Sequence, residues 1–179
     1  MKLKPPWKGS GMCEAASAAA QRNLHHHQSG NRDAKIILLV DDDHTVRESL
    51  RDLLVSEGYR VIPAENGQQA LDRINRLPAD LVLLDLNMPV MSGWDTFEQL
   101  TREHPLLPTI IITARANQLF TAASAGAGAL LEKPMDIPTL LQAIEKLLAE
   151  TTEQRLARLV GKNSEFTFGP AIARQRRGS

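Results

Sequence analysis

Five polar side chains follow apolar runs of this 179-residue sequence, at points where buried strands would end. Asp41 and Asp42 follow the first run, Asp85 ends a Leu-Val-Leu-Leu run, and Thr113 and Lys133 follow two later runs. In open parallel sheets, ligands bind outside the carboxyl ends of the strands. If these runs form one such sheet, the five side chains meet at one edge, and the sequence predicts a site there.

The chemistry of this site follows from its charges. Three carboxylates crowded at one edge repel one another, so they need a cation to remain ionised. A site of carboxylate, carbonyl and water oxygens suits Mg²⁺ better than zinc or calcium cages. The Thr113 hydroxyl and the Lys133 ammonium would face the same point, where they suit an incoming phosphoryl group. Asp85 would attack that group in line.

Simpler interpretations exist for each aspartate. A lone strand-end residue such as Asp85 is more often a cap or a turn residue than a nucleophile. Asp43 suits the N-cap of a helix, and the same alternative applies to Asp41 and Asp42. A flavin site is poorly supported, because no hydroxyl-rich phosphate loop follows the first strand. The prediction therefore depends on the ordered set of residues rather than on any one of them.

Five apolar strands alternate along the sequence with five helical patterns. The strands are short runs bounded by turn residues, and we expect them at Ile36–Val40, Arg60–Pro63, Leu81–Leu84, Thr109–Ile112 and Ala129–Glu132. Helical spacing of apolar residues indicates helices at 46–54, 70–74, 94–100, 117–124 and 137–149. Such an alternation with short connections predicts an α/β fold with a doubly wound parallel sheet.

The order and spacing of these motifs resemble the receiver domain of response regulators in two-component signalling. The resemblance covers residues 35–150, and its main motifs are Ile-Leu-Leu-Val-Asp-Asp-Asp at 37–43, Leu-Asp-Leu-Asn-Met-Pro at 84–89, Met91, Gly93, Thr113-Ala114 and Lys133-Pro134. It implies the flavodoxin-like fold of the chemotaxis type, with five helices and five parallel strands in the order 2-1-3-4-5.

The resemblance also implies a metal site and a phosphoacceptor. Asp85 would be the phosphoacceptor, and Mg²⁺ would be the ion. Asp42 would ligate this ion directly, while Asp41 would act through a water molecule. Asn87 would contribute its backbone carbonyl, so the implied metal site consists of Asp41, Asp42, Asp85 and Asn87.

Further residues would handle the phosphoryl group. By the resemblance, Thr113 would bond the bound phosphoryl group, and Lys133 would pair with its oxygens. The peptide bond between Lys133 and Pro134 would be cis. Asn87 and Arg115 occupy positions that tune the lifetime of the phosphoryl group in the family.

Two features depart from the family pattern. Leu130 stands three residues before the lysine, where family members usually carry Tyr or Phe coupled to the threonine. The segment from Thr113 to Gly126 is shorter than usual, and we expect its Ala-rich helix, which ends before Gly126, to be weak. Both changes touch the usual output face, formed by the fourth helix, the fifth strand and the fifth helix. We therefore expect intact phosphoryl chemistry and an altered readout.

Two basic tails flank an acidic centre. Residues 1–34 carry five basic and two acidic side chains, residues 35–150 carry ten and seventeen, and residues 151–179 carry six and two. We expect the first tail, with its tract of three histidines, to be disordered. We expect the second tail to be solvated and to prolong the last helix through Leu156, Leu159 and Val160. Nucleic-acid binding by this tail is a minority interpretation.

The sequence predicts a receiver with no fused output domain. We expect it to accept a phosphoryl group on Asp85 from a histidine kinase or a phosphotransfer protein, and then to change its binding to a separate protein. It would catalyse its own phosphorylation and slow dephosphorylation, which is less than the turnover of an ordinary enzyme. The alternatives are a scaffold that binds partners whatever its phosphorylation, and a receiver with a nucleic-acid-binding tail. A homodimer formed through the last helix is a further alternative.

The sequence also indicates in which cellular compartment the protein is expected. The lone Cys13 excludes an internal disulfide and suits a reducing environment. No run approaches the ~18 apolar residues of a membrane span, and the basic, Ala-rich start lacks the apolar core of a secretory signal. We expect a cytoplasmic protein without membrane contact.

Overall fold

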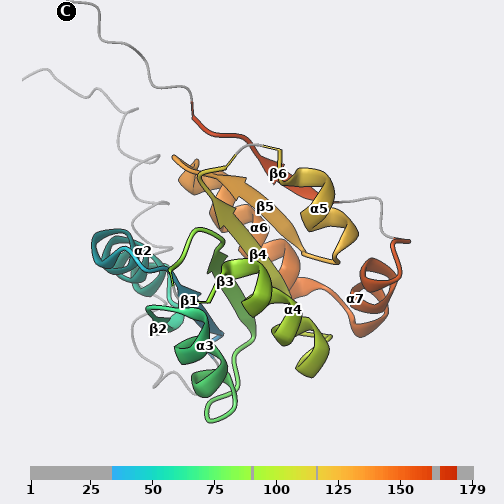
Figure 1. Cartoon of the computed structure of the whole chain (residues 1–179), viewed down its shortest axis with the longest axis horizontal. Coiled ribbons are helices and arrows are strands. Elements are labelled where there is room, and N and C mark those ends of the chain that lie inside the picture. The colour runs from blue at the N-terminus through green and yellow to red at the C-terminus, as the bar shows by residue number, and fades with distance from the viewer. Residues whose placement is uncertain (1–33, 90, 116, 163–165, 173–179) are drawn as a thin grey trace, which may run out of the picture. The chain divides into compact units, whose positions relative to one another are not determined.

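The computed structural model describes residues 34–89, 91–115, 117–162 and 166–172 of the chain (Figure 1). Its elements follow one another in the order β1 (Ile36–Val40), α2 (His44–Ser56), β2 (Arg60–Ala64), α3 (Gly67–Ile74), β3 (Leu81–Asp85), α4 (Gly93–Glu103), β4 (Thr109–Thr113), α5 (Leu119–Ser124), β5 (Ala129–Glu132), α6 (Ile137–Ala149), α7 (Thr152–Leu159) and β6 (Thr167–Gly169). The bounds of β1, β5 and α6 are those predicted from the sequence.

The strands form one parallel sheet with the order β2-β1-β3-β4-β5-β6. The first five strands confirm the predicted flavodoxin-like order, and β6 adds a short sixth strand that the sequence reasoning did not include. In the register of the sheet, Asp85 pairs with Ile112, and Thr113 pairs with Glu132. The carboxyl ends of the central strands therefore lie side by side, as the predicted site requires.

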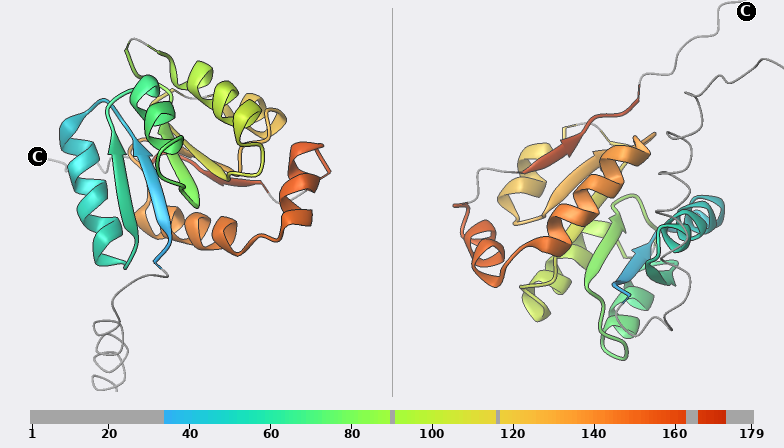
Figure 2. Two further views of the ribbon diagram at one scale, coloured as in Figure 1. Left: turned by 90° about the horizontal axis from the view of Figure 1, so that it is seen from below. Right: turned by 180° about the vertical axis from the view of Figure 1, so that it is seen from behind.

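Two layers of helices cover the two faces of the sheet (Figure 2). Successive side chains of a strand point to opposite faces. In β3, Val82 and Leu84 pack with α3, α4 and α5, whereas Leu81 and Leu83 pack with α2 and α6. All four are fully buried. Continuous apolar strands of this kind occur where both faces of a parallel sheet are covered, and the two cores fix the strand ends that carry the site.

Asp43 begins α2, as predicted. Its carboxylate accepts hydrogen bonds from the backbone N–H groups of Thr45 at 2.8 Å and Val46 at 3.1 Å. The bonds from Val46 and Thr45 hold the pKa of Asp43 below its usual range. This N-cap makes the helix start directly after the two predicted site aspartates.

Asp80 stabilises the opposite end of β3. Its carboxylate accepts hydrogen bonds from the backbone N–H of Ile36 at 2.8 Å and from the ammonium of Lys35 at 2.9 Å. Burial raises the pKa of Asp80, but these bonds outweigh burial and hold its pKa below the usual range. The ionised carboxylate thus ties the start of β3 to the start of β1.

The chain after α6 differs from the predicted extension of the last helix. Helix α6 ends at Ala149, and α7 is a separate helix whose N-cap is Thr151. The Thr151 hydroxyl accepts the N–H of Gln154, and the Gln154 side chain accepts the N–H of Thr151. This reciprocal capping box begins a new helix instead of continuing the old one.

The prediction that the basic tail is solvated is wrong at Arg158 of α7, which is buried. Its side chain is 7% exposed, and its guanidinium donates to the Gly126 carbonyl at 2.5 Å and to the Glu150 carboxylate at 3.2 Å. Within the described residues, α7 is therefore fastened to the loop before β5. A charged residue is buried here because it is paired.

β6 and the residues that follow it cover the outer edge of β5. It pairs in parallel with β5. Past its end, the N–H of Ala171 donates to the Glu132 carboxylate at 3.3 Å, and the N–H of Ile172 donates to the Pro134 carbonyl at 2.9 Å. The C-terminal segment thus reaches the residues on both sides of Lys133.

Some predictions concern residues outside the described ranges. They are the N-terminal tail up to residue 33 with its histidine tract, and the basic residues Arg174, Arg176 and Arg177. Among the residues that the structure describes, no helix is both long enough and apolar enough to cross a membrane.

Candidate functional site

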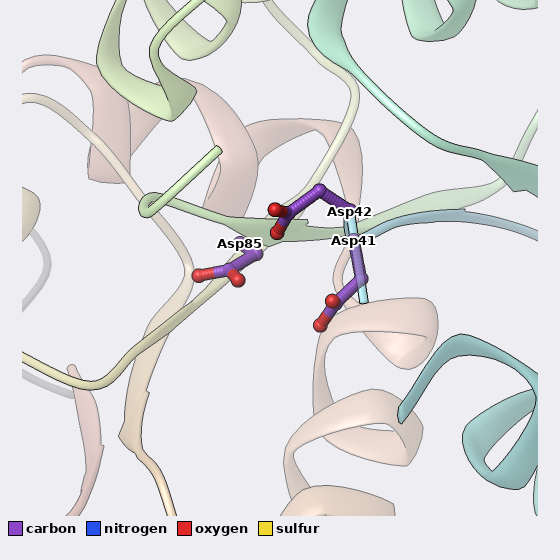
Figure 3. A group of neighbouring side chains, drawn as sticks. All are labelled: Asp41, Asp42 and Asp85. Carbon is purple, nitrogen blue, oxygen red and sulfur yellow. The ribbon is translucent and has the colours of Figure 1, made fainter. Parts of the chain in front are cut away.

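The three predicted aspartates meet at the carboxyl edge of the sheet (Figure 3). Carboxylate oxygens of Asp41, Asp42 and Asp85, one from each, all lie within 4.8 Å of one another. Asp41 and Asp42 follow β1, and Asp85 ends the neighbouring strand β3. Asp41 and Asp85 are buried, whereas Asp42 is exposed, so the cluster is accessible to solvent at Asp42.

Lys133 bridges two of these carboxylates. Its Nζ lies 2.8 Å from Oδ2 of Asp41 and 2.8 Å from Oδ2 of Asp85. Burial lowers the pKa of Lys133, but the hydrogen bonds to both carboxylates outweigh burial and raise its pKa above the usual range. Burial is also the main influence on Asp41 and raises its pKa, which Lys133 offsets only in part. Three carboxylates and one ammonium leave an excess of negative charge.

Asp85 and Thr113 share one hydrogen-bond network. The backbone N–H of Asn87 donates to Oδ1 of Asp85 at 3.0 Å, and the Asn87 amide donates to Oγ1 of Thr113 at 3.5 Å. The backbone N–H of Arg115 donates to the same hydroxyl oxygen at 3.0 Å. Thr113 is fully buried. The structure therefore brings together all of the predicted site residues, with Lys133 on the other oxygen of Asp85.

Arg47 belongs to the site, although the sequence reasoning missed it. Its guanidinium donates to the carbonyl of Asp41 at 2.7 Å and to that of Asp42 at 3.4 Å, and it lies 3.5 Å from the Glu65 carboxylate. The residue is 5% exposed. A signal was present in the sequence, because Arg47 stands three residues before Leu50 on the buried face of α2, where a charge is unusual. Arg47 positions the backbone that carries both aspartates.

Gly93 allows α4 to begin against the end of β3. A Cβ at this position would lie 2.3 Å from the Asp85 carbonyl oxygen and 2.4 Å from Cα of Leu86. The N–H of Gly93 donates to the Leu86 carbonyl at 3.2 Å, and Ser92 caps the helix. The backbone of Asp85 is therefore held between its own strand and the start of α4.

The donor set fits a hard divalent cation. Carboxylate oxygens are the ligands that Mg²⁺ prefers, together with water, and the exposed Asp42 leaves room for water. The excess negative charge and the raised pKa of Asp41 are both effects that a bound cation would relieve. Asp41, Asp42 and Asp85 are thus suited to hold Mg²⁺.

A doubly wound sheet that carries an acidic cluster, a threonine and a lysine at its carboxyl edge defines the receiver class of signalling domains. Residues 37–145 match the family model described as the response regulator receiver domain. This match covers more than half of the chain, and the chain belongs to that family. The resemblance inferred from the sequence is confirmed.

Curated relatives are longer than this chain. The response regulator MprA of Mycolicibacterium vanbaalenii is 39% identical over 134 residues, which cover 74% of this chain and 57% of the relative. The DNA-binding transcriptional regulator NtrC of Escherichia coli is 35% identical over 145 residues, which cover 78% of this chain and 31% of the relative. The similarity therefore concerns the receiver part of these proteins.

Solved structures agree with this assignment. A CheY-like response regulator receiver domain protein from Methanospirillum hungatei has a TM-score of 0.63 and 32% identity, covering 68% of this chain and 98% of that one. The response regulator TrrA of Thermotoga maritima, solved in complex with Mg²⁺-BeF, has a TM-score of 0.60 and 33% identity, covering 63% and 98%.

The two departures from the family pattern have a structural setting. Leu130 is fully buried and pairs with Ile111 of β4 and Phe168 of β6. Helix α5 has six residues and no side-chain N-cap, and of these six only Ala122 is buried. The side of the sheet next to β5 therefore consists of the short helix α5, the buried Leu130 and the edge strand β6.

Proposed function

We propose that this chain is a phosphorylation-dependent switch in the cytoplasm. It accepts a phosphoryl group on Asp85 from a histidine kinase or a phosphotransfer protein, with Mg²⁺, and then changes its binding to a separate protein. The observation that carries this proposal is the position of Asp85, whose carboxylate touches Lys133 inside an acidic cluster at the carboxyl edge of the sheet. Membership of the receiver family supports it.

The reaction is a transfer between two heteroatoms. A carboxylate oxygen of Asp85 forms a bond to phosphorus while the phosphorus–nitrogen bond of the donor phosphohistidine breaks, and the released imidazole takes a proton from solvent. The reaction needs no oxidant or reductant. The backbone N–H of Asn87 and the ammonium of Lys133 orient the attacking carboxylate.

The charges of the site indicate which residues would assist the phosphoryl transfer to Asp85. When bound, Mg²⁺ supplies positive charge that shields the phosphoryl oxygens from the carboxylates. Asp41, Asp42 and Asp85 would hold it, with the backbone carbonyl of Asn87 as the further predicted ligand. Lys133 adds a point charge at Asp85, and the hydroxyl of Thr113 is connected to Asp85 by two hydrogen bonds through Asn87. These residues would favour the added charge of the phosphorylated state.

The test is phosphorylation by acetyl phosphate with Mg²⁺, followed by intact mass. The expected result is the gain of one phosphate, which disappears in Asp85→Asn and in excess chelator. The matched control is Asp80→Asn, because Asp80 is a carboxylate that directly precedes β3, at the end of the strand opposite to Asp85. No phosphate gain from acetyl phosphate or from a panel of kinases would refute the switch.

A scaffold that binds its partner whatever its phosphorylation is the second candidate. The observation that favours it is Leu130, an apolar and fully buried side chain with no polar group to report on Thr113. Partner affinity measured with and without beryllofluoride separates the two functions. An unchanged affinity supports the scaffold, and a changed affinity supports the switch.

A further inference from the structure

A cavity lies at the edge of the sheet opposite to the acidic cluster. Its volume is ≈ 590 Å³, and it is formed by the end of α3, the loops that precede β3 and β4, and Arg155 of α7. We call it the α3–α7 cavity. Ligand pockets commonly have volumes of about 300–1,000 Å³. Arg155 lies beyond residues 37–145, so part of the lining comes from outside the region that matches the receiver family.

Basic side chains dominate the charge of the α3–α7 cavity. Arg76, His104 and Arg155 line it, and neither guanidinium forms a salt bridge with any residue that the structure describes. Asp80 also lines the cavity and attracts Arg155 electrostatically, but its carboxylate is already bound by the Lys35 ammonium and by a backbone N–H. Apart from His104, two guanidiniums and one ammonium face one carboxylate, which leaves an excess of two positive charges.

Two buried nitrogen atoms of the lining residues have no hydrogen-bond partner in the described part of the chain. They are Nε of Arg155 and Nε2 of His104. The Arg155 guanidinium donates through Nη1 to the Leu106 carbonyl at 3.3 Å, which leaves most of its five donors free. Buried polar groups without partners cost free energy. A ligand with several acceptor oxygens would therefore stabilise these side chains once they turn towards it.

The rest of the lining indicates what else the ligand carries. Pro78, Pro105 and Leu106 are exposed apolar residues of the cavity, and they offer a surface for a flat ring. Helices α3 and α4 both end at the cavity. The last carbonyl oxygens of a helix have no partner within the helix, so they can accept hydrogen bonds from the hydroxyl or amino groups of a ligand.

We propose that the α3–α7 cavity binds a nucleoside monophosphate. Its phosphate lies at Arg76 and Arg155, because a guanidinium binds phosphate oxygens through two parallel hydrogen bonds. A phosphate monoester carries about 1.5–2 negative charges at pH 7, which matches the excess of two positive charges. The base lies against the apolar residues, and the ribose hydroxyls are donors for the helix ends.

Other occupants match the cavity less well. A ligand with a single carboxylate neutralises only half of the excess charge. Residues 1–33 of the chain carry net positive charge, which the arginines of the cavity would repel. An acidic peptide brings several carboxylates, and the partial negative charge at the ends of α3 and α4 opposes those that do not reach an arginine. One compact phosphate group avoids this repulsion.

Binding would also stabilise the contact of α7 with the receiver. Arg155 belongs to α7 and Arg76 to the loop after α3, so the phosphate connects two segments that are distant in sequence. A ligand that binds only the folded state stabilises that state. We therefore expect slower amide hydrogen exchange in α7 when the ligand is bound.

The test uses the full chain, adenosine monophosphate (AMP) as the probe, and excess chelator, so that no Mg²⁺ is present at the acidic cluster. Calorimetry is expected to show binding of AMP and much weaker binding of adenosine and of inorganic phosphate, because each lacks one part of the ligand. Arg76→Met and Arg155→Met should each lower the affinity for AMP about tenfold, since one guanidinium–phosphate contact is lost. Arg102→Met is the matched control, because its exposed guanidinium lies outside the lining.

Several results would overturn the proposal. Equal affinity for AMP and adenosine would exclude the phosphate contact, and equal affinity for AMP and inorganic phosphate would exclude the contact with the base. AMP binding that both arginine variants leave unchanged would place AMP elsewhere. Binding of a polyglutamate peptide, but not of AMP, would assign the cavity to an acidic protein. The proposal does not depend on phosphorylation: Asp85→Asn is expected to retain AMP binding, and loss of binding in this variant would place AMP at the acidic cluster instead.

Discussion

Replacing Arg158 by Met tests how firmly the C-terminal segment is attached. The guanidinium of Arg158 forms an ion pair with the Glu150 carboxylate, and it also donates a hydrogen bond to the Gly126 carbonyl. Both side chains of the ion pair are nearly buried, at 7% and 8% exposure. Met keeps much of the volume of the Arg stem and removes the charge and all of the donors. The substitution therefore isolates the polar contribution of this contact.

The expected loss of stability is about 3 kcal/mol. Removing one partner of a buried ion pair costs about 3–5 kcal/mol, and a buried carbonyl left without a donor costs about 1–3 kcal/mol. The two losses overlap, because Glu150 can turn towards water. The loss of stability also has an upper limit, which is the free energy that holds α7 and β6 on the receiver. A larger loss would release this segment instead of unfolding the whole domain.

Urea unfolding and hydrogen exchange measure these two outcomes. Arg158→Met is expected to lower the free energy of unfolding and to speed amide exchange at Phe168 and Ile172, while β1 and β3 stay protected. Adding Glu150→Gln should restore part of the loss, because no buried charge is then unpaired. Arg155→Met is the matched control, since Arg155 is less buried and donates a 3.3 Å hydrogen bond to the Leu106 carbonyl. A change within about 0.5 kcal/mol and unaltered exchange would refute the reasoning.

Three further substitutions test the site and its supports. Asp41→Asn should stabilise the metal-free protein at pH 7 by about 1 kcal/mol. Because the pKa of Asp41 is raised in the folded state, the contribution of Asp41 to stability falls as the pH rises above about 4, so urea titrations should show the variant gaining stability relative to the wild type over that range. Asp80→Asn should remove stability that is present above about pH 4 and lost in acid, since the folded-state pKa of Asp80 is lowered; equal acid-unfolding curves for the variant and the wild type would contradict this. Gly93→Ala should cost about 1–3 kcal/mol and slow phosphorylation by acetyl phosphate, because its Cβ would displace the backbone of Asp85; thermal unfolding together with intact mass checks both effects.

The sequence predicted the central fold well because the relevant signals are local. Each strand of the first five is an apolar run between turn residues, and the alternation with helices leaves few possible topologies. The site was predictable for the same reason: Asp85 and Lys133 stand at strand ends, and strand ends meet at one edge. Their separate roles in metal and phosphoryl binding stay predictions.

The C-terminal elements were not predictable in the same way. β6 has three residues, one of them Gly169, and it has no periodic pattern of its own. Its position depends on the edge of β5 and on contacts such as that of Ile172 with Pro134, which connect residues distant in sequence. The capping box of Thr151 was visible in the sequence, but helical spacing beyond it favoured a longer α6. Long-range pairing decided this part of the fold, and a local pattern does not encode it.

The place of β6 in the chain has a consequence for biosynthesis. Translation delivers residues 34–149, with both cores of the sheet, before residues 167–172 leave the ribosome. Until then, the outer edge of β5 has free backbone N–H and carbonyl groups beside a folded core, which is the kind of edge that joins other nascent chains. Each newly made molecule therefore passes through a period in which its core is complete and its sheet is still open, and this period ends only when β6 arrives.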